Sequence, residues 1–303
     1  IIERKTTDRI LVLFVFLCFA TAMGSFIYYI MHFKEVTESY KHAKTIPVVI
    51  EHIRYSLMLT IAFFCSIVLY ISSPIIKTPL TKKIITGMGL FIFIFLHILS
   101  IRSGLLALYA TAFIWLLVMI IQKRDKRFLL LIPAALVFPV IMYWFVPSLH
   151  NKVEYMVRDI TRFASGKSVN NYSDGNRLLS MKIGTEIGLE HPVLGVGSGD
   201  VEQEMNKAYE TQYPDIDPHN RLIPHNQFVY IFTALGFTGL FIFIICLLLP
   251  VFTKEIFTDV FCLSVLVSSY SSFLSEATLE VQQGIVLVSL LFSLAYIRIY
   301  SKG

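Results

Sequence analysis

Long apolar segments alternate with shorter polar connections along almost the whole chain of 303 residues. A bilayer has a hydrocarbon core about 30 Å thick, so a helix needs roughly 20 mainly apolar residues to cross it. The segments of this kind are residues 10–31, 54–72, 84–100, 103–121, 128–146, 227–249, 256–275 and 281–299. The pattern predicts an all-α, polytopic transmembrane helical bundle of about eight spans. One large loop, residues 147–224, separates the fifth span from the sixth.

The composition agrees with a membrane protein. Hydrophobic residues make up 55% of the chain and charged residues only 16%, whereas a soluble domain has about 25% charged residues. We therefore expect a single membrane domain over residues 1–303, with the large loop inserted in it. The formal charge of +5 comes mostly from residues at helix ends, which argues against nucleic-acid binding. Because the chain begins with Ile1 rather than Met, we expect further helices to precede it.

Basic residues divide the polar connections into two groups. The connections on one side carry clusters at 4–9, 77–83 and 123–127. Those on the other side hold only a few lysines together with Arg54 and Arg102. Short loops rich in lysine and arginine stay in the cytoplasm. Both ends of the chain are therefore predicted inside, and the large loop outside.

Two helices are expected within the large loop. Apolar residues recur at helical spacing over 153–163, with basic residues between them, which predicts an amphipathic helix. Such a helix either lies on the membrane surface or packs against the rest of the loop, and the sequence favours neither alternative. A second helix is predicted from Asn176 to about Gly188.

Two arginines stand at the predicted outer edge of the membrane. A charge inside a bilayer is costly and usually marks a functional position. Arg102 lies between two apolar segments beside Ser103 and Gly104, and small residues of this kind let helices approach closely. Arg54 opens the second predicted span. The alternative for both is that the side chain merely reaches the lipid headgroups, and it weighs more heavily for Arg54.

A third candidate arginine lies in the large loop. Arg177 follows Asp174-Gly175-Asn176, and a glycine-rich run occupies residues 191–199. Glycines permit tight turns and a close approach of the backbone to a ligand. Their spacing does not match a dinucleotide-binding fingerprint. Taken alone, the glycine-rich run predicts a turn.

Two near-copies of one tripeptide, Pro218-His219-Asn220 and Pro224-His225-Asn226, stand at the end of the loop. The second copy comes immediately before the apolar span at 227–249. A histidine at the entrance of a helix can act as a general base near neutral pH, which singles out His225. For either histidine taken alone, a loop residue bonded to the backbone is the simpler interpretation.

Signs of a metal or cofactor site are weak. Asp215-Ile216-Asp217 matches the Asp-x-Asp pattern that binds metal and nucleotide sugar in soluble transferases. It lies between Pro214 and Pro218 on the predicted outer side, where nucleotide sugars are not expected. The cysteines lack the spacing of a zinc site and are expected to be buried in apolar surroundings: Cys18, Cys65, Cys246 and Cys262. We therefore expect no metal and no cofactor.

Taken together, these features resemble the O-antigen ligase and polymerase superfamily, with its related bacterial protein O-oligosaccharyltransferases. The resemblance extends from about residue 84 to residue 249 and rests on an ordered set of motifs. In order, the motifs are Arg102-Ser103-Gly104, Gly175-Asn176-Arg177, the run 191–197, His225-Asn226 and Leu235-Gly236-Phe237-Thr238-Gly239-Leu240. Members of this family usually have more than eight spans.

The resemblance implies a reaction at the periplasmic face of a bacterial inner membrane. A glycan on undecaprenyl pyrophosphate would be transferred to an acceptor hydroxyl, without a metal and with inversion at the anomeric carbon. Arg102 and Arg177, with Arg54 in reserve, would bind the donor pyrophosphate, since arginine forks match phosphate oxygens. His225 would deprotonate or orient the acceptor, supported by Asn226.

Two questions stay open at this point. A carrier or flippase for a lipid-linked glycan is the alternative, although transporters tend to contain internal repeats and none is visible in this sequence. The acceptor is not identified either. Lipid A core would make the protein a ligase, a growing glycan a polymerase, and a protein serine or threonine an oligosaccharyltransferase.

Overall fold

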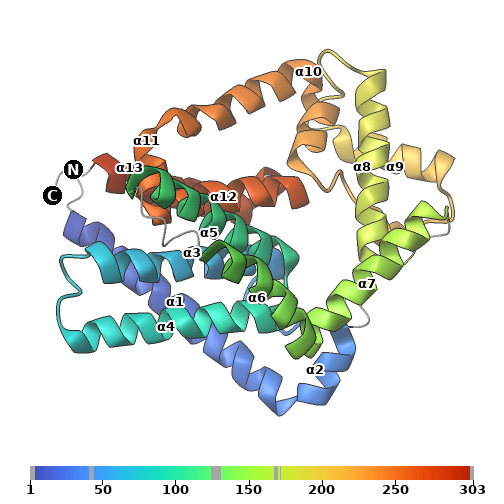
Figure 1. The fold of residues 1–303 in the computed structure, drawn as a ribbon. Coiled ribbons are helices and arrows are strands. Elements are labelled where there is room, and N and C mark those ends of the chain that lie inside the picture. Colours follow the sequence, from blue (N-terminus) through green and yellow to red (C-terminus); the bar gives the residue numbers. More distant parts are fainter. Residues whose placement is uncertain (1–3, 41–43, 124–130, 167–169, 171, 301–303) are drawn as a thin grey trace. The chain divides into compact units, whose positions relative to one another are not determined.

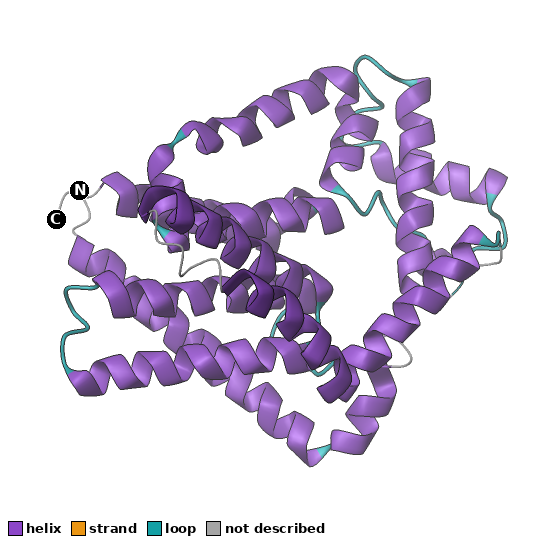
Figure 2. Ribbon diagram, in the orientation of Figure 1, coloured by secondary structure: helices purple, strands orange, loops and turns teal. Residues whose placement is uncertain are grey.

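The computed structural model describes residues 4–40, 44–123, 131–166, 170 and 172–300. These residues form helices, turns and loops, with no strand among them (Figure 2). The all-α prediction is therefore confirmed for the described part of the chain. The α-helices, labelled in Figure 1, are α1 (Arg4–Met31), α2 (Phe33–Ser39), α3 (His52–Ser72), α4 (Pro79–Leu99), α5 (Arg102–Lys123), α6 (Leu131–Phe145), α7 (Pro147–Ala164), α8 (Ser173–Glu190), α9 (Val201–Gln212), α10 (Gln227–Leu248), α11 (Lys254–Thr258), α12 (Val260–Ser275) and α13 (Gln282–Tyr300).

Within the described residues, 6 helices are long and apolar enough to cross a membrane. They are α1, α3, α4, α5, α10 together with the 3-10 turn that extends it to Phe252, and α13. Each coincides with a segment predicted from the hydropathy pattern. The prediction of a helical membrane protein is thereby confirmed.

The two other predicted spans correspond to shorter helices. The segment at 128–146 overlaps α6, which has 15 residues, and residues 128–130 lie outside the described ranges. The segment at 256–275 is divided at Asp259 into α11 and the 16-residue α12. The count of eight spans and the outer location of the large loop stay predictions.

The chain separates into two compact units. Unit 1 consists of Ile1–Lys152, Thr253–Ser271 and Val286–Gly303. Unit 2 consists of Val153–Phe252 and Ser272–Ile285. Most of the large loop predicted at 147–224 therefore belongs to the same unit as α10, the helix that follows it.

Unit 1 is built around α3, which packs against α1, α4 and α5. Its core contains large apolar side chains that are fully buried: Leu11, Leu59, Phe64, Ile92 and Phe95. The polar groups inside it find partners on neighbouring helices. The Thr60 hydroxyl on α3, for example, donates to the Gly104 carbonyl on α5 over 2.9 Å. Such bonds replace water, which is absent from the bilayer core.

A two-residue turn connects α4 and α5 and places Arg102 at the start of α5. Ser100 adopts the left-handed conformation that ends α4, with φ 56°. The Tyr40 hydroxyl donates to the Leu99 carbonyl over 2.8 Å and satisfies one of the acceptors exposed at the helix end. Burial raises the pKa of Tyr40, so the hydroxyl keeps the proton that this bond requires.

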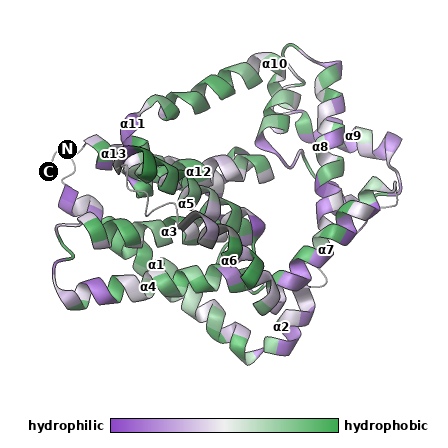
Figure 3. Ribbon diagram, viewed as in Figure 1, coloured by the Kyte–Doolittle hydropathy of each residue, from purple (hydrophilic) through white to green (hydrophobic). Residues whose placement is uncertain are grey.

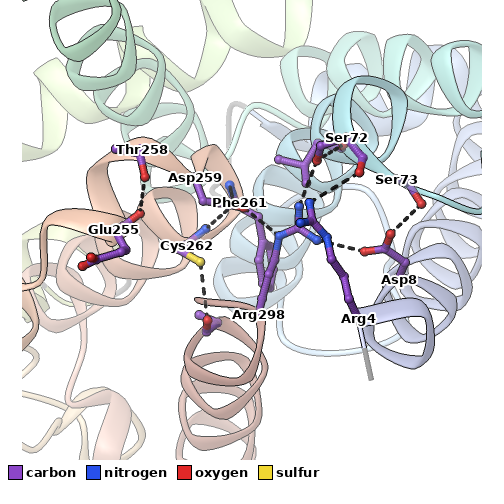
Figure 4. Close-up of polar contacts among 12 residues, drawn as sticks. Arg4, Asp8, Ser72, Ser73, Glu255, Thr258, Asp259, Phe261, Cys262 and Arg298 are labelled. Carbon is purple, nitrogen blue, oxygen red and sulfur yellow. Dashed lines mark hydrogen bonds and ion pairs between the residues drawn. The ribbon is translucent and has the colours of Figure 1, made fainter. Parts of the chain in front are cut away.

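Arg298, near the end of α13, joins the ends of four helices of unit 1 (Figure 4). Its guanidinium donates to the carboxylates of Asp259 (2.7 Å) and Asp8 (2.8 Å). It also donates to the Ser72 hydroxyl over 3.1 Å, while Asp8 accepts a further bond from Ser73. The side chains of Arg298 and Asp8 are 2% and 0% exposed. The guanidinium therefore offsets negative charge that is buried inside the protein.

Unit 2 has a core of its own between α8, α9 and the first part of α10. Its buried side chains include Leu179, Ile183, Val201, Met205, Tyr209 and Tyr230. Helix α8 confirms the helix predicted over 176–188 and is longer at both ends. Helix α9 is missing from the sequence-based prediction because most of its residues are polar, as Figure 3 shows.

Helix α7 confirms the helix predicted over 153–163 and extends it to Pro147–Ala164. Its buried edge in unit 2 is polar: Tyr155 and Asp159 face inward, whereas Val157 and Ile160 are exposed. The structure therefore supports packing against the loop along the polar edge. Contact of the exposed apolar edge with a membrane stays a prediction.

Helix α10 is interrupted at Gly236, whose backbone angles (φ 63°, ψ −163°) are not helical. In an unbroken helix each N–H donates to the carbonyl four residues earlier, and the interruption separates two such pairs. The glycine-rich segment 192–197 supplies new partners to all four groups. The bonds are Phe237 N–H to Pro192 (2.7 Å), Thr238 N–H to Val193 (3.4 Å), Val196 N–H to Thr233 (3.0 Å) and Gly197 N–H to Ala234 (2.8 Å).

Gly195 and Gly236 allow this insertion because each lies against the backbone of the other segment. A β-carbon on Gly195 would overlap Ala234 and Leu235, and one on Gly236 would overlap Val193. Both glycines have positive φ, 67° and 63°, which L side chains rarely adopt. The glycine-rich run is therefore more than the simple turn that it predicts when taken alone.

Beyond the interruption, α10 has few neighbours within the described residues and its apolar side chains are exposed. Cys246, which we expected to be buried, is one of these exposed residues. The prediction of burial was wrong for Cys246 because apolar residues of a membrane span can face lipid instead of protein. The other cysteines, Cys18, Cys65 and Cys262, are buried as expected.

Candidate functional site

His225 and Asn226 form the entrance of α10 in unit 2. The Asn226 side-chain oxygen accepts bonds from the N–H groups of Phe228 (2.9 Å) and Val229 (3.1 Å). These are donors that a helix start leaves without an internal partner. The Asn226 amide also donates to the Leu274 carbonyl over 3.0 Å. Asn226 thus fixes where α10 begins, and with it the position of His225.

One hydroxyl group links His225 to Arg177. The His225 N–H donates to the Ser180 Oγ on α8 over 3.2 Å. The same hydroxyl donates to the Arg177 carbonyl over 2.8 Å. Ser180 is fully buried, so this bridge is shielded from competing water. The structure therefore brings together two predicted site residues that are 48 positions apart in the sequence, as the numbering gives directly.

Small residues on one face of α8 let it lie close to α10. Gly184 contacts Pro224 and Thr233, and Gly188 lies against the ring of Phe232. The Thr233 hydroxyl donates to the Gly184 carbonyl over 2.8 Å. A larger side chain at either glycine would push the helices apart, and the bridge between them would break.

The start of α8 is held by α7. The carboxylate of Asp159 accepts bonds from the N–H groups of Asp174 (2.7 Å) and Gly175 (2.9 Å). The Tyr155 hydroxyl accepts a bond from the Ser173 N–H over 3.1 Å, and burial raises the pKa of Tyr155. The positive end of the α8 dipole is therefore already occupied by a carboxylate. An anion bound beside this helix must be met by side chains instead.

Two side chains on the first turn of α8 supply polar groups. The Arg177 side chain is half-buried and forms no ion pair with any residue that the structure describes. The Oδ1 atom of Asn176 is buried and has no hydrogen-bond donor among the described residues. A cation and a buried acceptor are therefore adjacent in the sequence on the first turn of α8, shortly before Ser180, the residue that binds the His225 N–H.

Arg54 and Arg102 belong to unit 1. Arg54 lies in the first turn of α3, where its guanidinium is 3.5 Å from the carboxylate of Glu51. Arg102 is the first residue of α5. Ser56 contacts Gly104, so the two helix starts that carry these arginines pack together. Arg177 and His225 belong to unit 2, and a site shared by all of them stays a prediction.

A comparison with protein-family models finds a match, described as O-antigen ligase, over residues 87–244. This stretch is 158 of the 303 residues, counted from its first and last positions, and so exceeds half of the chain. The chain belongs to the O-antigen ligase family. A comparison with curated proteins gives no match. The resemblance drawn from the motifs is therefore confirmed at the level of the family.

The stretch shared with the O-antigen ligase family contains the features described above. It begins within α4, and it includes the start of α5, the bridge between α8 and α10, and the interruption at Gly236. The family supports transfer of a glycan by a membrane-embedded protein that acts on lipid-linked glycans. The matched stretch ends at residue 244 and does not include α13.

A contact between Gln227 and Glu280 involves residues that were not among the predicted site residues. Gln227 is fully buried at the start of α10, where its side chain accepts from the Leu279 N–H (2.7 Å) and donates to Glu280 (3.2 Å). The carboxylate of Glu280 is thus held near the entrance of α10. Sequence reasoning missed it because residue 280 is 53 positions from Gln227 and follows an unremarkable apolar segment.

The described residues contain no group of three His, Cys, Asp or Glu side chains that could hold a metal ion. The Asp-x-Asp sequence instead forms a turn: the Asp217 carboxylate accepts from the His219 N–H over 2.9 Å. His219 itself is exposed. The two copies of the Pro-His-Asn tripeptide therefore occupy different environments, and His225 is the one tied to α8.

Proposed function

We propose that this member of the O-antigen ligase family transfers a glycan from an undecaprenyl-pyrophosphate donor to an acceptor hydroxyl. The reaction would take place at the periplasmic face of a bacterial inner membrane. The family supports glycan transfer in general. The observation that carries the finer proposal is the hydroxyl bridge through Ser180, which ties the backbone N–H of His225 to the backbone carbonyl of Arg177. It brings together the two residues that would supply a base and a cation.

In this proposal His225 accepts the proton of the acceptor hydroxyl through its imidazole. The acceptor oxygen then forms a bond to the anomeric carbon of the donor sugar. The bond from that carbon to the pyrophosphate oxygen breaks, and the pyrophosphate leaves as an anion with the bonding electron pair. Direct attack from the opposite face inverts the configuration of the anomeric carbon.

Arginine side chains would stabilise the charge on the leaving group. Cations positioned where negative charge develops lower the barrier of such a step, and a guanidinium fork matches phosphate oxygens. Arg177 suits this role because its charge is not neutralised by any described residue. Arg102 is the second proposed ligand, with Arg54 in reserve, since Arg54 already has Glu51 beside it. With arginines in this role the reaction needs no metal ion.

Asn226 would support the site by holding His225 at the entrance of α10. The acceptor remains one of three kinds, each with a hydroxyl group: lipid A core, a growing glycan or a protein serine or threonine. We further propose that residues 1–303 act as one membrane domain, with residues 147–224 on the periplasmic side.

The experiment that tests the proposal compares two histidines with the same flanking residues. Purified protein in detergent is given a lipid-linked donor and an acceptor hydroxyl, and product is measured over time. His225→Ala should lower turnover by about 10²- to 10⁴-fold, the usual contribution of a general base. His219→Ala should change it by a few-fold at most, because His219 is exposed.

The outcomes separate the alternatives. Equal losses in both variants would show that the loop is disrupted and that neither histidine is the base. An active His225→Ala beside an inactive His219→Ala would show that His219, and not His225, is the base. Wild-type protein that makes no product in detergent, yet moves a lipid-linked glycan across vesicles, would support the flippase instead.

A further inference from the structure

Exposed apolar side chains surround the place where α10 is interrupted. Val193 and Leu194, in the segment inserted into the interruption, are 65% and 73% exposed. Other large apolar residues are exposed next to them, at the end of α8 and on either side of Gly236. We call this set the break patch: Leu189, Val193, Leu194, Leu235 and Phe237.

The break patch continues into the surface by which α10 faces lipid. The part of α10 after the interruption is apolar and carries no charged residue. Its exposed side chains include Phe241, Ile242, Ile245 and Leu248. Between Phe237 and Phe241 the helix holds Thr238, Gly239 and Leu240, none of them charged. One apolar surface therefore extends from the span up to the inserted segment.

The length of the span sets the depth of the interruption. Residues 237–252 comprise α-helix and one 3-10 turn, which together rise roughly 25 Å. The hydrocarbon core is about 30 Å thick. This part of the span is too short to cross the core alone, so the interruption at Gly236 falls at or just inside the hydrocarbon boundary.

Irregular backbone at this depth needs internal partners, because lipid chains offer no hydrogen bonds. The four groups freed by the interruption all have such partners in the segment 192–197. Within the segment, the carbonyls of Pro192 and Val193 and the N–H groups of Gly195, Val196 and Gly197 have backbone partners. The exposed side chains of Val193 and Leu194 are apolar, so this part of the segment is suited to contact with lipid.

We propose that the break patch is a membrane anchor that inserts into the acyl chains of the leaflet at the start of α10, predicted to be the outer one. Glu190 and His191, exposed between Leu189 and Val193 of the patch, require water or headgroups, so the anchor dips shallowly below the interface. The proposal does not depend on the reaction that the protein catalyses.

The anchor fixes the height of the candidate site above the membrane. Gly184 and Gly188 hold α8 against α10, and the inserted segment directly continues α8. Arg177 and His225 are therefore connected through short rigid elements to a group embedded in lipid. A lipid-linked pyrophosphate carries its charge at the headgroup plane, and an anchor of this kind keeps the first turn of α8 at a constant distance from that plane.

Spin-label accessibility in proteoliposomes tests the anchor. Single cysteines replace Val193 and Leu194 in a background without the native cysteines, since Cys246 is exposed. Each is labelled with a nitroxide and exposed to oxygen, which concentrates in hydrocarbon, and to a water-soluble nickel chelate. Both positions should collide severalfold more with oxygen than with the chelate.

Two exposed positions serve as matched controls. Ile242→Cys, on the part of α10 after the interruption, reports lipid, and Ser198→Cys, just past the inserted segment, reports water. Labels at 193 and 194 that behave like the label at 198 would overturn the proposal. Labels reached by neither reagent would overturn it as well, because another protein surface or a second copy of the chain would then cover the patch.

Discussion

Arg298 in unit 1 and Arg177 in unit 2 are both arginines on helices, but their charges are used in opposite ways. Arg298 is 2% exposed and donates to two carboxylates and a hydroxyl. Arg177 is half-buried and forms no ion pair with any described residue. Its backbone carbonyl accepts a bond from the Ser180 hydroxyl.

This difference separates a structural cation from one that can bind a ligand. The partners of Arg298 come from α1, α3 and the start of α12 (Figure 4). Its charge therefore holds helices of unit 1 together. Arg177 has its backbone fixed within α8, and its guanidinium has no carboxylate partner among the residues that the structure describes. A site for an anion requires this second arrangement, because a cation that is already neutralised gains little from a further negative charge.

The largest expected effect is that of Arg298→Ala on stability. Removing one partner of a buried ion pair leaves the carboxylates of Asp8 and Asp259 without a cation, which typically costs about 3–5 kcal/mol. The fraction of protein that remains monodisperse in detergent after heating should fall steeply. Arg4→Ala is the matched control, since Arg4 makes one exposed bond to Ser72 over 3.4 Å and should change stability little. If Arg298→Ala and the wild type had the same thermal stability, the structural role of Arg298 would be refuted.

Arg177→Ala should give the reverse result, with activity lost and stability kept. Loss of one group that stabilises developing negative charge costs about 10²- to 10³-fold in turnover. Arg177→Lys should recover only part of this, since an ammonium keeps the charge without the planar fork. Arg158→Ala, an exposed arginine on α7, controls for the loss of a positive charge and should stay active. If Arg177→Ala were fully active, cations other than Arg177 would have to bind the donor pyrophosphate.

The contrast between the two arginines is only partly visible in the sequence. The hydropathy pattern predicts the membrane-spanning helices, because each of them needs a long apolar segment to cross the lipid. The motifs single out Arg177 and His225. The partners of Arg298 are hidden, since Asp8 is 290 positions away and no local pattern connects them.

The interruption of α10 illustrates the same limit. Gly236 and the run 191–197 are both conspicuous in the sequence, but each taken alone predicts only a flexible position or a turn. Their meaning depends on four backbone bonds between segments about 40 residues apart in the chain. Side-chain patterns carry no information on such bonds, because every residue other than proline offers the same N–H and carbonyl groups.

The smallest expected effect, that of Ser180→Ala, tests the bridge itself. Without the hydroxyl, the His225 N–H loses its acceptor, and a bond of this kind contributes about 0.5–1.5 kcal/mol. Turnover should therefore fall by about three- to tenfold, with little change in thermal stability. Thr185→Val is the matched control, because the Thr185 hydroxyl donates only to a carbonyl of its own helix, that of Met181, and its removal should leave turnover near the wild-type value.

A double variant separates positioning of His225 from a general loosening of α8. If Ser180 acts through His225, Ser180→Ala should lower turnover in the wild-type background but add nothing once His225 is alanine, since interacting residues are not additive. Equal reductions in both backgrounds would show that the hydroxyl merely stabilises α8. In that case the link between Arg177 and His225 would be a feature of packing, and the two side chains would have to be assigned to the reaction separately.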